Sequence, residues 1–164
     1  MASRIFEALG WQRHALRPTS ELRSLMMTWE MVRALPKEGI AIGAHTVSHS
    51  ILTNMEEREA EREITESKRR IETQLGEPVR HFAYPNGTRR DWSPAIISLV
   101  RRAGFETACT TVQGGNGLHS NPYELRRIEI QDGGCLTPFG NFSPTLFVAE
   151  LTGVFSLLRR SNKS

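Results

Sequence analysis

Residues 39–54 read GIAIGAHTVSHSILTN, and this stretch decides how the rest of the chain is interpreted. Its apolar first part, residues 39–44, has the length of a short buried strand and leads directly into His45 and His49, which are four residues apart. On one helical turn, two imidazoles at this spacing lie on the same face and can bind one zinc-like ion at about 2.0–2.1 Å. The simpler alternative is that one histidine caps the following helix and the other is exposed.

Helix signals flank this stretch on both sides. Before it, Thr28 is a favourable N-cap, and Pro36 ends the short helix that Thr28 begins. After it, Thr53 and Glu56 have capping-box spacing and introduce a long amphipathic helix that Gly76 closes. The segment between these two helices is therefore expected to be a strand followed by a loop.

The same alternation continues towards the C-terminus. Helix, strand, helix, strand is the order of a parallel α/β sheet or barrel. We expect residues 1–27 to be an irregular lead-in and residues 28–164 to form one domain. Within it we expect strands at VRHFAYP (79–85), ETACTTV (106–112) and YELRRIEI (123–130), a helix that Ser93 caps, and a closing amphipathic helix over 144–160.

The position of the histidines in this order favours a metal site. In parallel α/β folds, ligands bind at the carboxyl ends of the strands. His45 and His49 follow the first expected strand, and Pro85 and Asn86 follow the second. Both loops are thus expected at the same edge of the sheet, and the small hydroxyl side chains around the histidines can orient imidazole ligands.

These residues resemble the polysaccharide deacetylases of carbohydrate esterase family 4, which share the chitooligosaccharide deacetylase homology domain. IGAHTVSHSILTNM is similar to the His-[Ser/Thr]-x-x-His motif of that family. The likeness covers about residues 28–130, and FGNFSPTLFVAELTG near the C-terminus is also similar, as in bacterial members linked to exopolysaccharide synthesis. Further similar stretches occur in the matching order: MTWEMVRAL, GEPVRHFAYPNG, AGFETACTT and NPYELRRI.

The resemblance implies a distorted (β/α) barrel and a metal-dependent hydrolase that removes acetyl groups from N- or O-acetylated sugars of a polysaccharide. A divalent ion, most often Zn²⁺, would be held by His45 and His49, polarise the acetyl carbonyl and lower the pKa of a bound water. The Asn86 backbone N–H, next to Pro85, would stabilise the oxyanion. An acetylated polysaccharide or oligosaccharide is the implied partner.

The resemblance also suggests which side chains contact the sugar. Tyr84 and Phe82 would line the sugar groove, with core packing as the alternative for Phe82. The arginine that the family commonly has two residues before its proline is replaced by Ala83. His119 is either a catalytic residue or a surface histidine, because the family's late Leu-x-His segment, the source of the general acid, is not recognisable. Arg127 would either reach the site or hold a carboxylate.

One part of the family site has no counterpart in this sequence. The Thr-Phe-Asp-Asp-Gly segment, which supplies the family's third ligand and general base, is absent, and the aspartates are Asp91 and Asp132. The chain therefore resembles the C-terminal part of a deacetylase barrel without its N-terminal strands, as a mis-assigned start, a degenerate gene or a natural fragment would produce. With two of the usual three protein ligands, we expect weak metal binding and little turnover.

Composition sets further limits on the function. A chain of 164 residues with 38% hydrophobic and 24% charged residues is typical of one soluble globular domain. The net charge of +3 is spread over the whole chain, and no nucleic-acid-binding motif occurs, so we expect no nucleic-acid partner. No stretch has the character of a signal peptide or a membrane span, and localisation stays open because a targeting segment would lie upstream of Met1.

Two alternatives to an active enzyme follow from the missing motif. The chain is either a partial deacetylase or a non-catalytic remnant of the same fold that binds a glycan or a partner protein. An incomplete barrel also leaves strand edges and apolar faces uncovered, which favours self-association.

Overall fold

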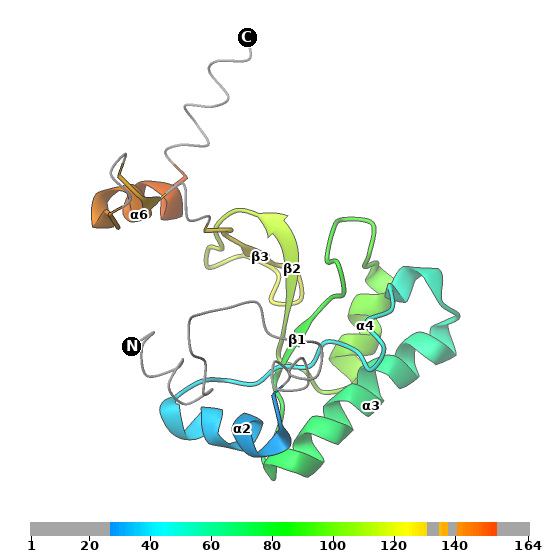
Figure 1. The fold of residues 1–164 in the computed structure, drawn as a ribbon. Helices are drawn as coiled ribbons and strands as arrows, with labels where there is room; N and C mark the ends of the chain where they lie inside the picture. Colours follow the sequence, from blue (N-terminus) through cyan, green and yellow to red (C-terminus); the bar gives the residue numbers. More distant parts are fainter. Residues whose placement is uncertain (1–26, 131–134, 138–140, 154–164) are drawn as a thin grey trace, which may run out of the picture.

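The computed structural model describes residues 27–130, 135–137 and 141–153. Helices and strands alternate in the expected order, and α3 and α4 lie beside the strands while α6 stands apart from them (Figure 1). The elements in chain order are α2 (Trp29–Ala34), the 3-10 turns η2 (Leu35–Glu38) and η3 (Leu52–Asn54), α3 (Glu57–Leu75), β1 (His81–Ala83), α4 (Pro94–Arg102), β2 (Thr107–Gln113), β3 (Leu125–Arg127) and α6 (Pro144–Leu151).

The three strands form one parallel sheet in the order β1-β2-β3. Phe82 pairs with Ala108 between β1 and β2, and Cys109 pairs with Leu125 between β2 and β3. Parallel neighbours require a crossover connection, which α4 provides between β1 and β2. The expected strands at 79–85, 106–112 and 123–130 are therefore all present, although the first and third are only three residues long.

The strand expected over residues 39–44 is reduced to one bridge. Ala44 forms a parallel bridge with Phe82. The Ala44 N–H donates to the His81 carbonyl (2.8 Å), and the Ala83 N–H donates to the Ala44 carbonyl (2.9 Å). Residues 40–43 are exposed or half-buried, so the prediction of a buried strand is wrong for most of this segment. Its backbone nevertheless runs parallel to β1 where the histidine loop begins.

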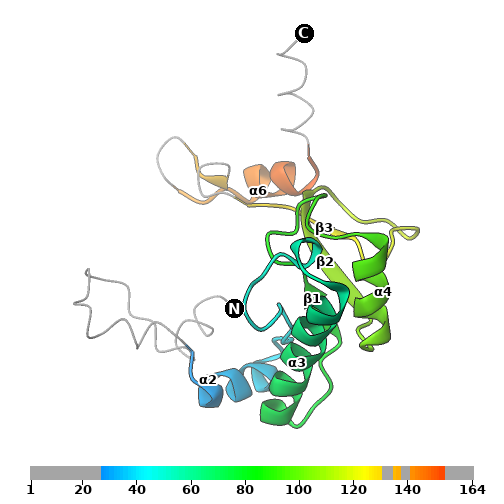
Figure 2. The same ribbon diagram turned by 90° about the vertical axis from the view of Figure 1, so that its right-hand side faces the viewer.

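The hydrophobic core lies between the sheet and the two helices α3 and α4. Successive side chains of a strand point to opposite faces of a sheet. Phe82, Ala108 and Thr110 are at most 1% exposed on the helix-covered face, whereas His81 and Thr111 on the other face are exposed. Figure 2 shows α3 and α4 together on one side, with α2 at the C-terminal end of α3. The core cluster consists of Ala44, Leu52, Ala60, Ile64, Val79, Phe82, Tyr84, Ile96, Leu99, Val100, Phe105 and Ala108.

Two of the three expected N-caps are present. The Thr28 and Ser93 hydroxyl oxygens each accept a hydrogen bond from the backbone N–H three residues further on (both 3.3 Å). The capping box expected at Thr53 and Glu56 is wrong: Glu56 is the N-cap of α3 and makes no side-chain capping bond. The Thr53 hydroxyl instead donates to the Arg90 carbonyl (2.9 Å), which ties η3 to the loop before α4.

The C-terminal helix is shorter and less buried than expected. The single helix predicted over 144–160 ends at Leu151, with Thr152 as its C-cap and Gly153 at φ 74°, in the left-handed region. No residue of α6 is buried. Residues 154–160 and most of the expected lead-in, residues 1–26, lie outside the described residues. No described helix is both long and apolar enough to cross a bilayer.

Candidate functional site

His45 and His49 lie together in a loop at the carboxyl edge of the sheet. Their ring centroids are 4.8 Å apart, with 76° between the ring planes. The expected helical turn is absent, because Thr46 (φ 60°) and His49 (φ 59°) both have left-handed backbones and the loop between them bends. The two imidazoles are therefore brought together by loop geometry, and both side chains are exposed.

A backbone carbonyl of β1 orients the His45 ring. His45 Nδ1 is 2.7 Å from the Ala83 carbonyl oxygen. Because a carbonyl can only accept, Nδ1 carries the hydrogen and the Nε2 lone pair is left for a ligand. Metal-binding histidines are commonly held by such a hydrogen bond from the second ring nitrogen. The bridge between Ala44 and Phe82 places both partners of this bond in one parallel register.

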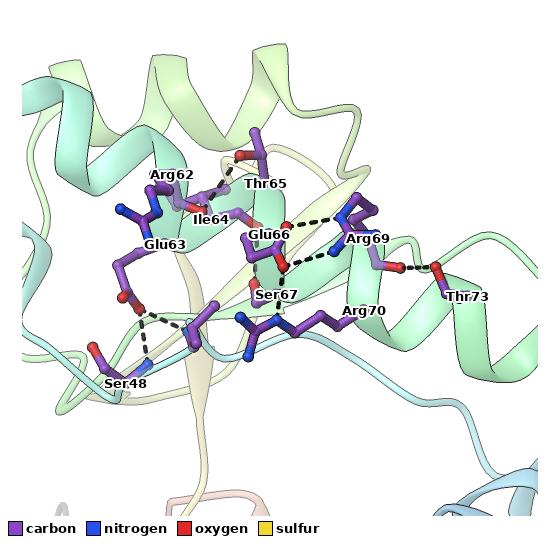
Figure 3. A network of polar contacts seen from close by, with 11 residues as sticks. Ser48, Arg62, Glu63, Ile64, Thr65, Glu66, Ser67, Arg69, Arg70 and Thr73 are labelled. Atoms are coloured by element: carbon purple, nitrogen blue, oxygen red, sulfur yellow. Dashed lines mark hydrogen bonds and ion pairs between the residues drawn. The ribbon is translucent and has the colours of Figure 1, made fainter.

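Glu63 of α3 holds the segment between the two histidines. Its Oε2 accepts hydrogen bonds from the Val47 N–H (2.7 Å) and the Ser48 N–H (2.9 Å), the latter visible with the labelled Ser48 in Figure 3. Partial burial raises the pKa of the Glu63 carboxyl, but the hydrogen bonds from Val47 and Ser48 outweigh it, and the pKa lies below its ordinary value. The charged form therefore prevails near neutral pH and fixes the loop.

Sequence reasoning missed Glu63, because it is one of many glutamates on α3. Its neighbour Glu66 shows the contrast in Figure 3: it accepts hydrogen bonds from Arg69 (both 2.8 Å) and Arg70 (2.8 Å) of the same helix. These contacts hold the pKa of Glu66 at about 2 without reaching another element. No spacing in the sequence separates the glutamate that holds the loop from the one that pairs along the helix.

The loop after β1 is fixed to β2. Asn86 (φ 56°) and Gly87 (φ 67°) are consecutive left-handed residues, as the Asn-Gly pair predicts. The Thr111 hydroxyl donates to the Asn86 carbonyl (2.6 Å), and the Thr111 N–H donates to the Gly87 carbonyl (2.8 Å). Pro85 is buried and Asn86 is exposed. Among the described residues the Asn86 N–H has no hydrogen-bond acceptor, which leaves it as a donor at this edge.

Tyr84 and Phe82 lie in the core and not in a groove. Phe82 is 1% exposed and Tyr84 is 2% exposed. The Tyr84 hydroxyl donates to the Tyr123 carbonyl (2.9 Å), and burial raises the pKa of Tyr84 above its ordinary value. Phe82 is therefore a core residue, the alternative considered from the sequence. Neither Phe82 nor Tyr84 is accessible to a sugar in this structure.

His119 and Arg127 are not brought to the histidine pair by any described contact. His119 lies exposed in a turn of the loop between β2 and β3. Arg127 is the last residue of β3, and its carbonyl accepts from the Gly114 N–H (3.0 Å) while its side chain is exposed. Neither shares a hydrogen bond or ion pair with His45 or His49 in the described part of the chain.

The donor set fits part of a zinc site. Two imidazoles with one Nδ1–H already bonded supply two of the usual three protein ligands of a catalytic zinc. Within the described ranges, no cluster of three or more His, Cys, Asp and Glu side chains is arranged to hold a metal. The Thr46 hydroxyl between the histidines is buried without a partner there, so the loop retains an unused polar group.

The sequence profile described as "Polysaccharide deacetylase" matches residues 11–108. The matched region contains His45, His49, Pro85 and Asn86 and excludes His119 and Arg127. It also begins within the segment expected as a lead-in. The resemblance noted from the sequence over residues 28–130 is confirmed for residues 28–108.

Individual relatives agree with the family match. The candidate polysaccharide deacetylase YxkH of Bacillus subtilis (strain 168) is 22% identical over 116 residues, 71% of this chain and 40% of YxkH. The Streptococcus pyogenes deacetylase PplD, solved with acetate, has a TM-score of 0.65 at 22% identity over 76% of this chain and 50% of its own. The Bacillus cereus polysaccharide deacetylase BC0361 has a TM-score of 0.60 at 19% identity, with coverages of 77% and 37%.

These comparisons place the fold as well. The parallel sheet and its helices match part of the α/β fold of solved polysaccharide deacetylases, as expected of a partial barrel. The chain spans half or less of the length of these relatives. Because the family match extends over more than half of its residues, the chain belongs to the polysaccharide deacetylase family.

Proposed function

We propose that this chain carries the two-histidine metal-binding part of a hydrolase that removes acetyl groups from N- or O-acetylated sugars of a polysaccharide. The observation that carries the proposal is the His45–His49 pair at the sheet edge, with His45 Nδ1 bonded to the Ala83 carbonyl. When bound, Zn²⁺ supplies Lewis-acid polarisation of a carbonyl and a more acidic water. Family membership supplies the reaction class.

The residues of this chain would contribute binding and orientation. The imidazole nitrogens of His45 and His49 hold the ion, and Glu63 fixes the loop between them through two backbone N–H groups. The Asn86 N–H donates towards the oxygen that gains negative charge during acyl hydrolysis, a contribution that is typically worth about 10²–10³ in rate. Pro85 restricts the backbone just before this donor.

Asp91, the one aspartate among the described residues, is bound within a turn. Asp91 is 8% exposed, and its Oδ2 accepts from both the N–H (2.8 Å) and the hydroxyl (2.6 Å) of Thr88, so it stabilises a turn. Asp132 lies outside the described residues. We therefore propose weak zinc binding and little turnover for this chain alone, until an additional carboxylate completes the site.

Zinc titration calorimetry of the full chain tests the metal site. We expect one zinc ion per chain and a loss of affinity of about tenfold or more in His45→Ala. His81→Ala is the matched control, because His81 is an exposed histidine that bonds Thr107 near the start of β1. Equal zinc affinity in His45→Ala and the unmodified chain would overturn the proposal.

A non-catalytic glycan-binding chain of the same fold is the second candidate. The observation that favours it is the lack of a third ligand in the described ranges. Acetate release from an acetylated chitooligosaccharide, measured with and without added zinc, separates the two. Binding of the oligosaccharide without zinc-dependent release would support the second candidate.

We also propose self-association through the open face of the sheet, with a second copy of the chain as the partner. Thr107 and Cys109 on this face are only half-buried, and Thr111 is exposed. Light scattering after size exclusion tests this: we expect the average mass to rise with concentration and Cys109→Arg to suppress the rise. A monomeric mass at all concentrations would exclude it.

A further inference from the structure

A polar pocket of about 280 Å³ lies on the helix-covered side of the sheet, next to the carboxyl end of β2. Its walls come from four segments: the loop after β1, Thr110 and Val112 in β2, the loop that connects β2 to β3, and Arg126 in β3. None of the histidine-loop residues lines it. The proposed deacetylation chemistry therefore leaves this pocket without a role.

Trp92 lines this pocket, and its indole carries a donor without a partner among the described residues. This donor, Nε1, is buried. The ring stacks on Tyr84, with centroids 6.1 Å apart and 29° between planes, and Tyr84 is itself fixed by its hydrogen bond to Tyr123. A buried donor without an acceptor is unfavourable, so a movement of the ring that brings this N–H to a ligand oxygen would be favoured.

Two guanidinium groups at the pocket are also without partners. Within the part of the chain that is described, neither Arg89 nor Arg126 forms a side-chain hydrogen bond or ion pair, whereas Arg80 and Arg102 face carboxylates. The backbone of Arg126 is held on both sides by the Asn116 side chain (both 3.0 Å). Guanidinium groups bind carboxylates through charge-assisted, often bidentate hydrogen bonds.

The pocket also contains one acidic group. Glu124 is half-buried, and its Oε2 accepts a hydrogen bond from the Asn121 amide. This carboxylate disfavours any anionic group placed directly beside it, but it can accept hydrogen bonds from ligand hydroxyls. The combination of free guanidiniums, an indole N–H and one carboxylate therefore matches a ligand with both hydroxyl and carboxylate groups.

We propose that this pocket binds an acidic sugar residue, a sugar ring that carries a carboxylate. The carboxylate contacts Arg89 and Arg126, an oxygen of the ring accepts from the Trp92 indole, and a hydroxyl donates to Glu124. Arg89 and Trp92 belong to the same connection between β1 and α4 as Asn86, and we infer that a polymer at the histidine edge extends into this pocket. The inference rests on the proposed function in naming an acidic polysaccharide as the substrate class.

Nuclear magnetic resonance of the metal-free full chain tests the site, with glucuronate as the probe and glucose as the neutral control. The Trp92 indole N–H signal is identified by its absence in Trp92→Phe. We expect glucuronate to shift this signal in a saturable way and glucose to leave it in place. An equal shift with sodium acetate would overturn the sugar assignment, and no saturable shift with glucuronate would overturn the site.

Arginine variants provide the matched comparison. Because Arg89 and Arg126 are exposed, Arg89→Gln and Arg126→Gln should keep the fold, and we expect each to weaken glucuronate binding by about tenfold. Arg80→Gln removes an exposed arginine that pairs with Glu106 and should have no effect. Unchanged binding in both pocket variants would contradict the proposal.

A histidine variant separates this inference from the proposed function. The double substitution His45→Ala, His49→Ala removes the proposed metal ligands but no pocket residue. We expect the glucuronate shift at Trp92 to persist in it, because no metal takes part. Loss of the shift in this variant would overturn the assignment to the pocket, whereas failed zinc binding with an intact shift would count against the metal site alone.

Discussion

The two faces of the three-stranded sheet differ in how completely they are packed. On one face, Phe82 and Ala108 are at most 1% exposed beneath α3 and α4. On the other, His81 and Thr111 are exposed and Cys109 is half-buried, although they alternate with buried residues on the same strands. The stability of the chain therefore resides on the helix-covered face, and the histidine loop lies at the edge between the two.

One packed face of a partial barrel is sufficient to position side chains at the edge of its sheet. A complete face with two helices is enough to fix the carbonyl that orients His45 and the helix that carries Glu63. The open face contributes little to folding, so it is where additional chain or a second copy has the most surface to cover. The packed face can thus position the two histidines even where the remaining ligand of the site is not supplied.

The largest effect is expected from a cavity on the packed face. Phe82→Ala should lower the free energy of unfolding by about 3–5 kcal/mol, because the ring is surrounded by core residues. Cys109→Ala, at the next register position on the open face, should cost below about 1 kcal/mol. Urea denaturation followed by circular dichroism measures both. Similar losses in the two variants would contradict the difference between the faces.

The second largest loss of stability is expected from a substitution of Gly87, at the edge of the sheet. Gly87→Ala combines a left-handed backbone (φ 67°) with a Cβ that would lie 2.8 Å from the Thr111 nitrogen, and should cost about 2–3 kcal/mol. Gly76→Ala has a similar φ of 72° but no atom within 4 Å of the added Cβ, and should cost about 1 kcal/mol. Equal unfolding midpoints for the two variants would show that contact with β2 does not constrain this loop.

The Glu63 contact connects the packed face to the histidine loop. Glu63→Ala leaves the Val47 and Ser48 N–H groups without their acceptor, and we expect zinc affinity to fall by about tenfold with a small change in stability. Glu66→Ala on the same helix removes only pairs with Arg69 and Arg70 and should leave zinc affinity unchanged. Recovery of affinity in Glu63→Gln, which keeps one acceptor oxygen, would show that the hydrogen bonds position the loop.

The smallest effect concerns pH at the far end of α3. Partial burial raises the pKa of Glu72, but hydrogen bonds from the Val79 N–H and from Lys68 lower it more, to below 4.5. Since the folded pKa is depressed, this contribution is fully present above pH 4.5 and is lost as pH falls through the lowered pKa. The urea concentration at the midpoint of unfolding should be lower at pH 3 than at pH 6. This difference should be smaller in Glu72→Gln. Identical pH dependence in both proteins would contradict this.

The order of elements could be predicted because the signals are local. Ser93 caps α4 and Gly104 follows its end with a left-handed backbone, as such residues do in most helices. The prediction of a buried strand over residues 39–44 was wrong because it rested on apolar composition alone. The length of a strand also depends on its neighbours in the sheet, which sequence patterns do not specify. The predicted capping box is absent because the Thr53 hydroxyl donates a hydrogen bond to the Arg90 carbonyl, outside the helix.

The proximity of the two histidines was predictable, but the geometry of their loop was not. His45 and His49 are close, as their spacing suggested, but the left-handed residues at 46 and 49 have no sequence signature in Thr and His. The family resemblance suggested that Tyr84 lines a groove, whereas the side chain is buried and its hydroxyl donates to the Tyr123 carbonyl, 39 positions away. Long-range contacts of this kind are not encoded in local spacing.

The pairing of β1 with β2 also has a consequence for how the chain reaches its structure. His81 and Thr107, which pair across these strands, are 26 positions apart, and α4 fills the connection between them. Closing this connection costs less conformational entropy than pairing strands from opposite ends of the chain would. The carbonyl that holds His45 therefore belongs to a unit whose strand pairing depends on one short stretch of the sequence.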